Sequence, residues 1–425
     1  MSEATAADLR GWLVEPDFSA ERRRPLIMDR AQRKLVETWP ESGFRRIKGP
    51  AGSGKSLVLA ARAAKRANEG MSVLIITFNI TLMHYLRDMV IRGFEKKGAS
   101  RNVVYKHFHG WCKDVCIDAD KRYEYISMMR GFLSKSKEVQ DRILNEDMPA
   151  LAATAIRENG HLLKHYDTIL VDEGQDFLPL WLNVVQGVLK PEGQMLLVAD
   201  ATQDLYGTAK TLTDDAMKKV KFSGPWAQLR TGYRLPPLAQ EHVGRFASEF
   251  ITDRSADLPD PAQGVLDVEN CHMRWIACSF RDAAETCERE IIEMMHHTGM
   301  NGLANADITF LTDASHVGRK AIDRLADRGI ETMSALDEIY DDRRREKLKF
   351  FVGTARLSAT TLHSFKGWES RLLVIYLSEA DTHEKIAAIY AGLTRLKEHP
   401  LGCRLTVVSS NLALNDYGRT WPEYG

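Results

Sequence analysis

The sequence predicts an α/β fold made of two units, each with a parallel β-sheet covered by helices. Short continuous apolar runs such as VLII at 73–76 alternate with helix-forming stretches, as expected for strands buried on both faces. The alternation restarts after Pro236 and Pro237, where a second series of strand and helix patterns begins. Because strand–helix–strand connections are right-handed crossovers, this order of elements indicates parallel sheets.

Taken in chain order, the first half divides into three parts. Residues 1–25 are polar and predict an N-terminal arm, whereas 26–112 and 166–230 carry the strand and helix patterns of the first unit. Its expected helices are 28–40 and 80–94, and its expected strands are a short run at 44–47, then 71–79, 102–108, 166–177 and 193–207. Residues 113–165 are charged and lack a strand pattern, which predicts a small helical insertion.

The second unit is expected to span 231–425. Its helix pattern at 238–250 is followed by strand patterns at 273–280, 306–313, 358–365, 371–378 and 404–410. The stretches 253–264 and 341–349 are expected to be loops. Only about fifty residues separate the 306–313 and 358–365 strands, so an insertion in this unit should be reduced or absent.

Composition limits the broad class of the protein. Lys+Arg and Asp+Glu both count 58, so the net charge neither predicts nor excludes nucleic-acid binding. No apolar run reaches the ~18 residues of a membrane span, and the N-terminus lacks a signal-peptide pattern. The six cysteines form no C-x-x-C pair and are expected to be reduced, buried thiols. We therefore expect a cytoplasmic protein without a membrane partner.

The stretch IKGPAGSGKS carries the pattern G-x-x-x-x-G-K-S between a strand and a helix. In this motif the backbone N–H groups of a glycine-rich turn face phosphate oxygens, and the helix N-terminus adds partial positive charge. Lys55 would reach the β- and γ-phosphates, and the Ser56 hydroxyl would bind Mg²⁺. The alternative is a chance glycine turn. The predicted nucleotide-binding residues are Gly49, Pro50, Ala51, Gly52, Ser53, Gly54, Lys55 and Ser56.

A second motif, ILVDEGQD, places two acids at the end of an apolar strand. Asp172 would hold Mg²⁺ at the carboxyl edge of the sheet, and Glu173 would polarise the attacking water. Adjacent acids on a solvated surface are the alternative interpretation.

Together with these two motifs, further motifs in a fixed order resemble those of superfamily 1 helicases of the UvrD/Rep type. The resemblance runs from about residue 28 to 410 and is also close to the helicase part of nuclease-related-domain proteins. The segments that carry it are AQRKL, TFNITLMHYLRD, KHFHGW, LLVADATQDLYG, LRTGYRLP, TTLHSFKGWES and IYAGLTRLKE. The chain departs from the family pattern at Gly232, Ala199 and His107, and it lacks the aromatic that often follows Tyr206.

The resemblance implies two RecA-like P-loop domains that share one ATP and Mg²⁺. Gln32 and Tyr233 would contact adenine and Glu369 the ribose. Gln203 would sense the γ-phosphate, and Arg234 and Arg395 would act as arginine fingers. The residues that would contact nucleic acid are Thr77, Phe78, Asn79, His107, Phe108, Tyr206, Thr361 and His363. For the aromatic rings among them the alternative is an ordinary core position, and for Thr361 and His363 it is a satisfied interior group.

The function implied is an ATP-dependent 3′-to-5′ translocase or helicase on single-stranded DNA or 3′-tailed duplex, in DNA repair or antiviral defence. RNA remains an open substrate. The second hypothesis is a regulatory ATPase that senses nucleotide or nucleic acid and gates a separate nuclease without unwinding. A P-loop kinase or transport ATPase would leave Arg234, Glu369 and Arg395 without a role.

Overall fold

A computed structural model describes residues 9–21, 23–50, 52–200, 217, 220–232, 235–251, 260–261, 270–336 and 356–425. The chain divides into two compact units. One comprises Leu26–Gly49 and Lys55–Leu229; the other comprises the segment up to Pro25, Pro50–Gly54 and Arg230–Gly425. Among the described residues, no helix is long and apolar enough to cross a membrane.

The first unit is built on a six-stranded sheet in the order β3-β2-β4-β5-β1-β6, and all its strand pairs are parallel. This confirms the predicted parallel α/β architecture. The strands are β1 (Phe44–Lys48), β2 (Val73–Thr77), β3 (Val103–His107), β4 (Tyr166–Asp172), β5 (Leu189–Ala199) and β6 (Ala227–Gln228).

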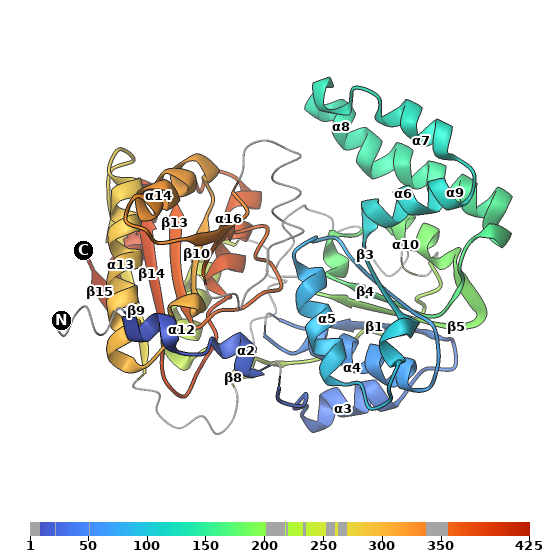
Figure 1. Cartoon of the computed structure of the whole chain (residues 1–425), viewed down its shortest axis with the longest axis horizontal. Coiled ribbons are helices and arrows are strands. Elements are labelled where there is room, and N and C mark those ends of the chain that lie inside the picture. Colours follow the sequence, from blue (N-terminus) through green and yellow to red (C-terminus); the bar gives the residue numbers. More distant parts are fainter. Residues whose placement is uncertain are drawn as a thin grey trace. The chain divides into compact units, whose positions relative to one another are not determined.

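Helices cover both faces of this sheet (Figure 1). Alternate side chains of the strands point to opposite faces, so Val73 and Ile75 pack on the α4 side, whereas Leu74 and Ile76 pack on the other. The helices are α3 (Arg30–Glu37), α4 (Lys55–Asn68), α5 (Leu82–Arg92), α6 (Phe108–Asp118), α7 (Arg122–Met129), α8 (Lys137–Arg142), α9 (Met148–Asn159) and α10 (Pro179–Gln186). Short helical turns are η1 (Ala99–Asn102), η2 (Phe132–Ser134), η3 (Ile143–Asp147), η4 (Gly160–Leu162) and η5 (Gly174–Asp176).

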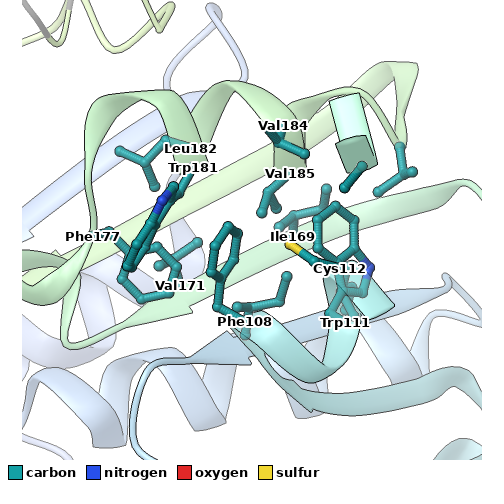
Figure 2. Packing of buried hydrophobic residues seen from close by; sticks show 14 of the residues in the cluster. Phe108, Trp111, Cys112, Ile169, Val171, Phe177, Trp181, Leu182, Val184 and Val185 are labelled. Atoms are coloured by element: carbon teal, nitrogen blue, oxygen red, sulfur yellow. The ribbon is translucent and has the colours of Figure 1, made fainter. Parts of the chain in front are cut away.

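The predicted insertion is helical, with α7 and α8 lying at its end far from the sheet (Figure 1). Its first helix starts at Phe108 rather than at residue 113. The reason is that α6 follows β3 directly and packs Phe108, Trp111 and Cys112 into the core beneath the sheet. Figure 2 shows these side chains facing Ile169 and Val171 of β4 and Trp181 of α10.

The second unit contains a seven-stranded parallel sheet in the order β11-β12-β10-β13-β14-β9-β15. The strands are β9 (Cys271–Ala277), β10 (Ile308–Thr312), β11 (Thr332–Ser334), β12 (Leu357–Thr361), β13 (Leu372–Leu377), β14 (Cys403–Ser409) and β15 (Glu423–Tyr424). The five strands expected here are confirmed, and the short edge strands β11 and β15 were not predicted from the pattern. A separate two-stranded pair consists of β7 (Thr231–Gly232) and β8 (Asp260–Pro261).

The helices of the second unit include the expected one, which is α12. They are α2 (Asp17–Glu21), α12 (Pro237–Phe250), α13 (Ala283–Asn301), α14 (Ser315–Asp327), α16 (His383–Leu393) and α17 (Asn415–Gly418), with the turns η8 (Asn305–Asp307) and η9 (Leu412–Leu414). Helices α13 and α14 enclose one apolar core with β10 and β13. Trp12 of the N-terminal segment packs against that core, so this segment belongs to the second unit.

Candidate functional site

The site in the first unit forms where three neighbouring strands end. Lys48 of β1 is aligned with Ala199 of β5, and Val171 of β4 is aligned with Leu197 of β5. The residues that follow these strands therefore meet at one edge of the sheet. Ligands bind at this carboxyl edge in open parallel α/β sheets.

The turn between β1 and α4 has the backbone that the glycine pattern requires. Gly52 has φ of 76° and Gly54 has φ of 84°, in the left-handed region that residues with a Cβ rarely adopt. Lys55 is the first residue of α4, and its Nζ donates to the Gly49 carbonyl at 2.6 Å. The same Nζ lies 3.2 Å from Oδ2 of Asp200, which is 2% exposed. The ammonium group thus sits at the edge of the sheet.

Ser56 and Asp172 are close together across this edge. The Ser56 hydroxyl donates to Asp172 Oδ2 at 2.9 Å. No group of three or more His, Cys, Asp or Glu side chains in the described part of the chain could hold a metal. A hydroxyl and one carboxylate are hard oxygen ligands that suit Mg²⁺, which keeps several waters and takes oxygens from bound phosphates. The donor set therefore fits the predicted ion.

Two further polar residues, Gln175 and Asp200, extend the hydrogen bonds of the site. Gln175 donates from Nε2 to Glu173 Oε2 and accepts from the Asp200 backbone N at 2.8 Å. The Glu173 backbone N donates to Asp172 Oδ1 at 3.0 Å. This chain of hydrogen bonds therefore connects Asp172 and Glu173, at the end of β4, to Asp200 and Lys55.

Gln175 and Asp200 were not among the predicted site residues. Asp200 directly follows β5, the strand between β1 and β4, so strand order would have indicated its position. The chain order of the strands alone did not show that β5 lies there.

Burial changes the ionisation of Asp172. Loss of hydration, together with the neighbouring Glu173 carboxylate, raises the pKa of Asp172 from 3.8 to about 7. Between those values the folded chain binds a proton that the unfolded chain does not. Stability from this group is therefore lost as pH rises through that range.

We expect Asp172→Asn to raise the Tm of the nucleotide-free protein at pH 8. The corresponding gain in unfolding free energy should be of the order of a few kcal/mol and should largely disappear near pH 3, where the carboxyl is mostly neutral in both states. Thermal unfolding of wild type and variant across this pH range measures the effect. Asp381→Asn, an exposed carboxylate paired with Lys385, is the control. An equal Tm difference at both pH values would contradict the expectation.

Gly174, in the turn after β4, has no room for a side chain. A Cβ there would collide with the Leu197 side chain and lie 3.0 Å from the Val198 carbonyl oxygen. Gly174→Ala should therefore push the turn carrying Glu173 away from β5 and cost about 1–3 kcal/mol of stability. Chemical denaturation measures this loss. Gly160→Ala is the control, because its Cβ would meet nothing closer than 3.9 Å. Equal stability of the two variants would refute the close approach of Gly174 to Leu197 and Val198.

Several residues predicted to contact nucleic acid lie at the carboxyl ends of β2 and β3. Thr77 is aligned with both Asp172 and His107. The Asn79 side chain accepts from the Thr81 N–H and hydroxyl, which fixes the turn into α5. Phe78 is partly buried and stacks on Trp181 with centroids 5.9 Å apart. These positions form one edge of the sheet, and their role stays a prediction.

The structure contradicts the prediction that the Phe108 ring contacts nucleic acid. Its side chain is 0% exposed, and its ring stacks on Trp181 with centroids 4.5 Å apart (Figure 2). The ring faces the core because α6 begins at this residue and turns that side of the helix beneath the sheet. A base cannot stack on it in this structure, so the alternative interpretation of a core aromatic applies.

Gln32 serves a structural role in the first unit. Its side-chain oxygen accepts the Asp29 backbone N–H at 3.0 Å, and the Asp29 carboxylate accepts the Gln32 N–H at 2.8 Å. This reciprocal pair caps α3. A contact of Gln32 with adenine stays a prediction.

The predicted residues of the second unit lie on three segments. Thr361 ends β12, and its hydroxyl donates to the Ser364 hydroxyl at 3.0 Å. His363 Nε2 lies 3.7 Å from Glu384 Oε1. Glu369 precedes β13 and is half-buried.

Arg395 lies just after α16 and is 2% exposed. Its Nε donates to the Ala391 carbonyl at 2.8 Å and its Nη2 to the Thr394 hydroxyl at 2.9 Å. Its Nη1 also donates to the Trp368 carbonyl at 3.4 Å, so the guanidinium is held both by its own segment and by the turn before β13. A role as arginine finger stays a prediction.

Five predicted residues lie outside the described part of the chain: Ala51, Gln203, Tyr206, Tyr233 and Arg234. The loop predicted at 341–349 and most of that at 253–264 also lie outside it.

The comparisons with known proteins add no family assignment. No protein-family model matches the chain, and a search of curated proteins finds no match.

Proposed function

We propose that the chain is an ATP-dependent 3′-to-5′ DNA translocase or helicase with two RecA-like units. The observation that carries this proposal is the connected cluster of Lys55, Ser56, Asp172, Glu173, Gln175 and Asp200 at one edge of the first sheet. Some of these residues lie well over a hundred positions apart in the sequence. The fold brings together the Lys55 ammonium group, the Ser56 and Asp172 oxygens that would bind a metal, and the Glu173 carboxylate.

This arrangement suits phosphoryl transfer to water. The reaction needs the charge on the transferring phosphoryl group to be neutralised and the attacking water to be oriented. Lys55 supplies a positive charge, and Ser56 and Asp172 would hold Mg²⁺. When bound, that ion neutralises charge on the β- and γ-phosphate oxygens. Glu173 is positioned by Gln175 and would accept the proton of the water.

The proposal is tested by the dependence of ATP hydrolysis on nucleic acid. We expect purified protein to hydrolyse ATP with Mg²⁺, and single-stranded DNA to raise the rate. RNA and forked duplex in parallel reactions identify the preferred substrate. Lys55→Ala is the control for contaminating ATPases. Hydrolysis that no nucleic acid stimulates would refute a translocase.

One observation favours the second candidate, a regulatory ATPase that gates a separate nuclease. Phe108 is in the core, which removes one of the rings expected to grip bases. A strand-displacement assay on 3′-tailed duplex separates the two functions. Robust unwinding by the chain alone would exclude the regulatory alternative, and nucleic-acid-stimulated hydrolysis without unwinding would favour it.

A further inference from the structure

Two acids of the N-terminal segment (residues 9–21) form ion pairs with the segment after α16 in the same unit. The Asp17 carboxylate lies 3.4 Å from Lys397 Nζ and 3.2 Å from His399 Nε2. Glu21 also pairs with Lys397. In addition, the Asp17 backbone N–H donates to Asp307 Oδ1 at 2.9 Å. The segment is therefore fixed by both its backbone and its charges.

The basic partner of these acids belongs to the segment that carries Arg395. Lys397 is two residues further along the chain, and its N–H donates to the Ser370 carbonyl at 3.0 Å. The Ser370 N–H in turn donates to the Arg395 carbonyl at 3.0 Å. These bonds join the segment after α16 to the residue that follows Glu369. A displacement of Lys397 would therefore be transmitted to both Arg395 and Glu369.

The charges around Lys397 are largely removed from water. Burial favours the neutral amine and lowers the pKa of Lys397, but the carboxylates of Glu369, Glu21 and Asp17 more than offset this and raise it. Burial also opposes ionisation of Asp17, yet the hydrogen bond from His399 and the charge of Lys397 lower the pKa of Asp17. Lys397 therefore stays charged beside the N-terminal acids. Removing one partner from such a buried network leaves other charges uncompensated.

A second ion pair keeps the same region in place. Arg371 pairs with Asp307, and its Nη1 lies 3.0 Å from His399 Nδ1. Asp307 and His399 are both partners of Asp17. The N-terminal segment thus joins η8, the start of β13 and the segment after α16, which are far apart in the sequence.

We propose that Asp17 and Glu21 are positioning residues for the nucleotide-facing part of the second unit. By holding Lys397, they fix the backbone at Ser370, directly after Glu369, and the backbone at Arg395. This inference rests on the proposed ATPase function and deepens it, because it assigns the N-terminal segment to nucleotide recognition.

The test compares nucleotide kinetics of three variants. Asp17→Asn combined with Glu21→Gln, and separately Lys397→Gln, should raise the KM for ATP about tenfold, equivalent to ~1.4 kcal/mol. The kcat should change less than the KM, because a ribose contact is made equally in the ground and transition states and the Arg395 guanidinium keeps its own bonds to Ala391 and Thr394. Lys397→Arg should restore a KM near that of wild type. Glu15→Gln, which alters an exposed pair with Arg23 in the same segment, is the control.

A second readout identifies Glu369 as the group that is positioned. Wild type should have a higher KM for 2′,3′-dideoxy-ATP than for ATP, and this difference should shrink in the acid and Lys397→Gln variants. A purely structural role would lower the Tm or the active fraction and leave this difference unchanged. Unaltered KM and ribose discrimination in an active, folded variant would overturn the inference but leave the proposed function standing. Failure of wild type and the Glu15→Gln control to bind or hydrolyse ATP would instead overturn the proposed function, and this inference with it.

Discussion

Arg395→Ala is expected to reduce ATP hydrolysis by about 10³–10⁵-fold while leaving ATP affinity close to that of wild type. An arginine finger acts on the charge that develops on the transferring phosphoryl group, so its loss affects the transition state far more than the bound nucleotide. Single-turnover hydrolysis and equilibrium binding of a fluorescent ATP analogue measure the two effects separately.

The structure also defines the competing outcome for Arg395. Its guanidinium donates to the Ala391 carbonyl and the Thr394 hydroxyl, so a structural arginine is the alternative. In that case hydrolysis and binding would fall together and the Tm would drop. Arg395→Lys is the matched variant, because it keeps a positive charge but loses the planar, multi-donor group. If Arg395 acts as an arginine finger, Arg395→Lys should also hydrolyse ATP far more slowly than wild type.

Glu173→Gln is expected to lower the rate of ATP hydrolysis by about 10²–10⁴-fold, the range for loss of a general base. Glutamine has nearly the same shape but cannot accept the proton of the attacking water. ATP binding should persist, because Lys55 and Ser56 are unchanged. Rapid-quench kinetics and nucleotide binding check both parts of this expectation.

The control for this variant lies on the same sheet. Glu192 is an exposed acid in β5, at the end of the strand opposite Asp200. Glu192→Gln removes the same charge without touching the site and should leave hydrolysis unchanged. Hydrolysis near the wild-type rate in Glu173→Gln would show that another group activates the water.

Local sequence was sufficient for most of the fold. Short continuous apolar runs such as 73–76 are typical of strands covered on both faces, and β2 coincides with that run. The glycines at 52 and 54 supply backbone angles that other residues avoid, so the tight turn between β1 and α4 could be predicted directly. The pairing of Ser56 with Asp172 was likewise implied by the motif and by the rule that ligands bind at carboxyl strand ends.

Other features depended on contacts that no local pattern contains. Asp200 approaches Lys55 because β5 lies between β1 and β4, and strand order follows from how whole helices pack on the sheet. Phe108 looks the same in the sequence whether it faces a base or the core, and packing against Trp181 decided for the core. The polar N-terminal segment had no readable partner, because the charges that attract Asp17 and Glu21 lie almost four hundred residues away.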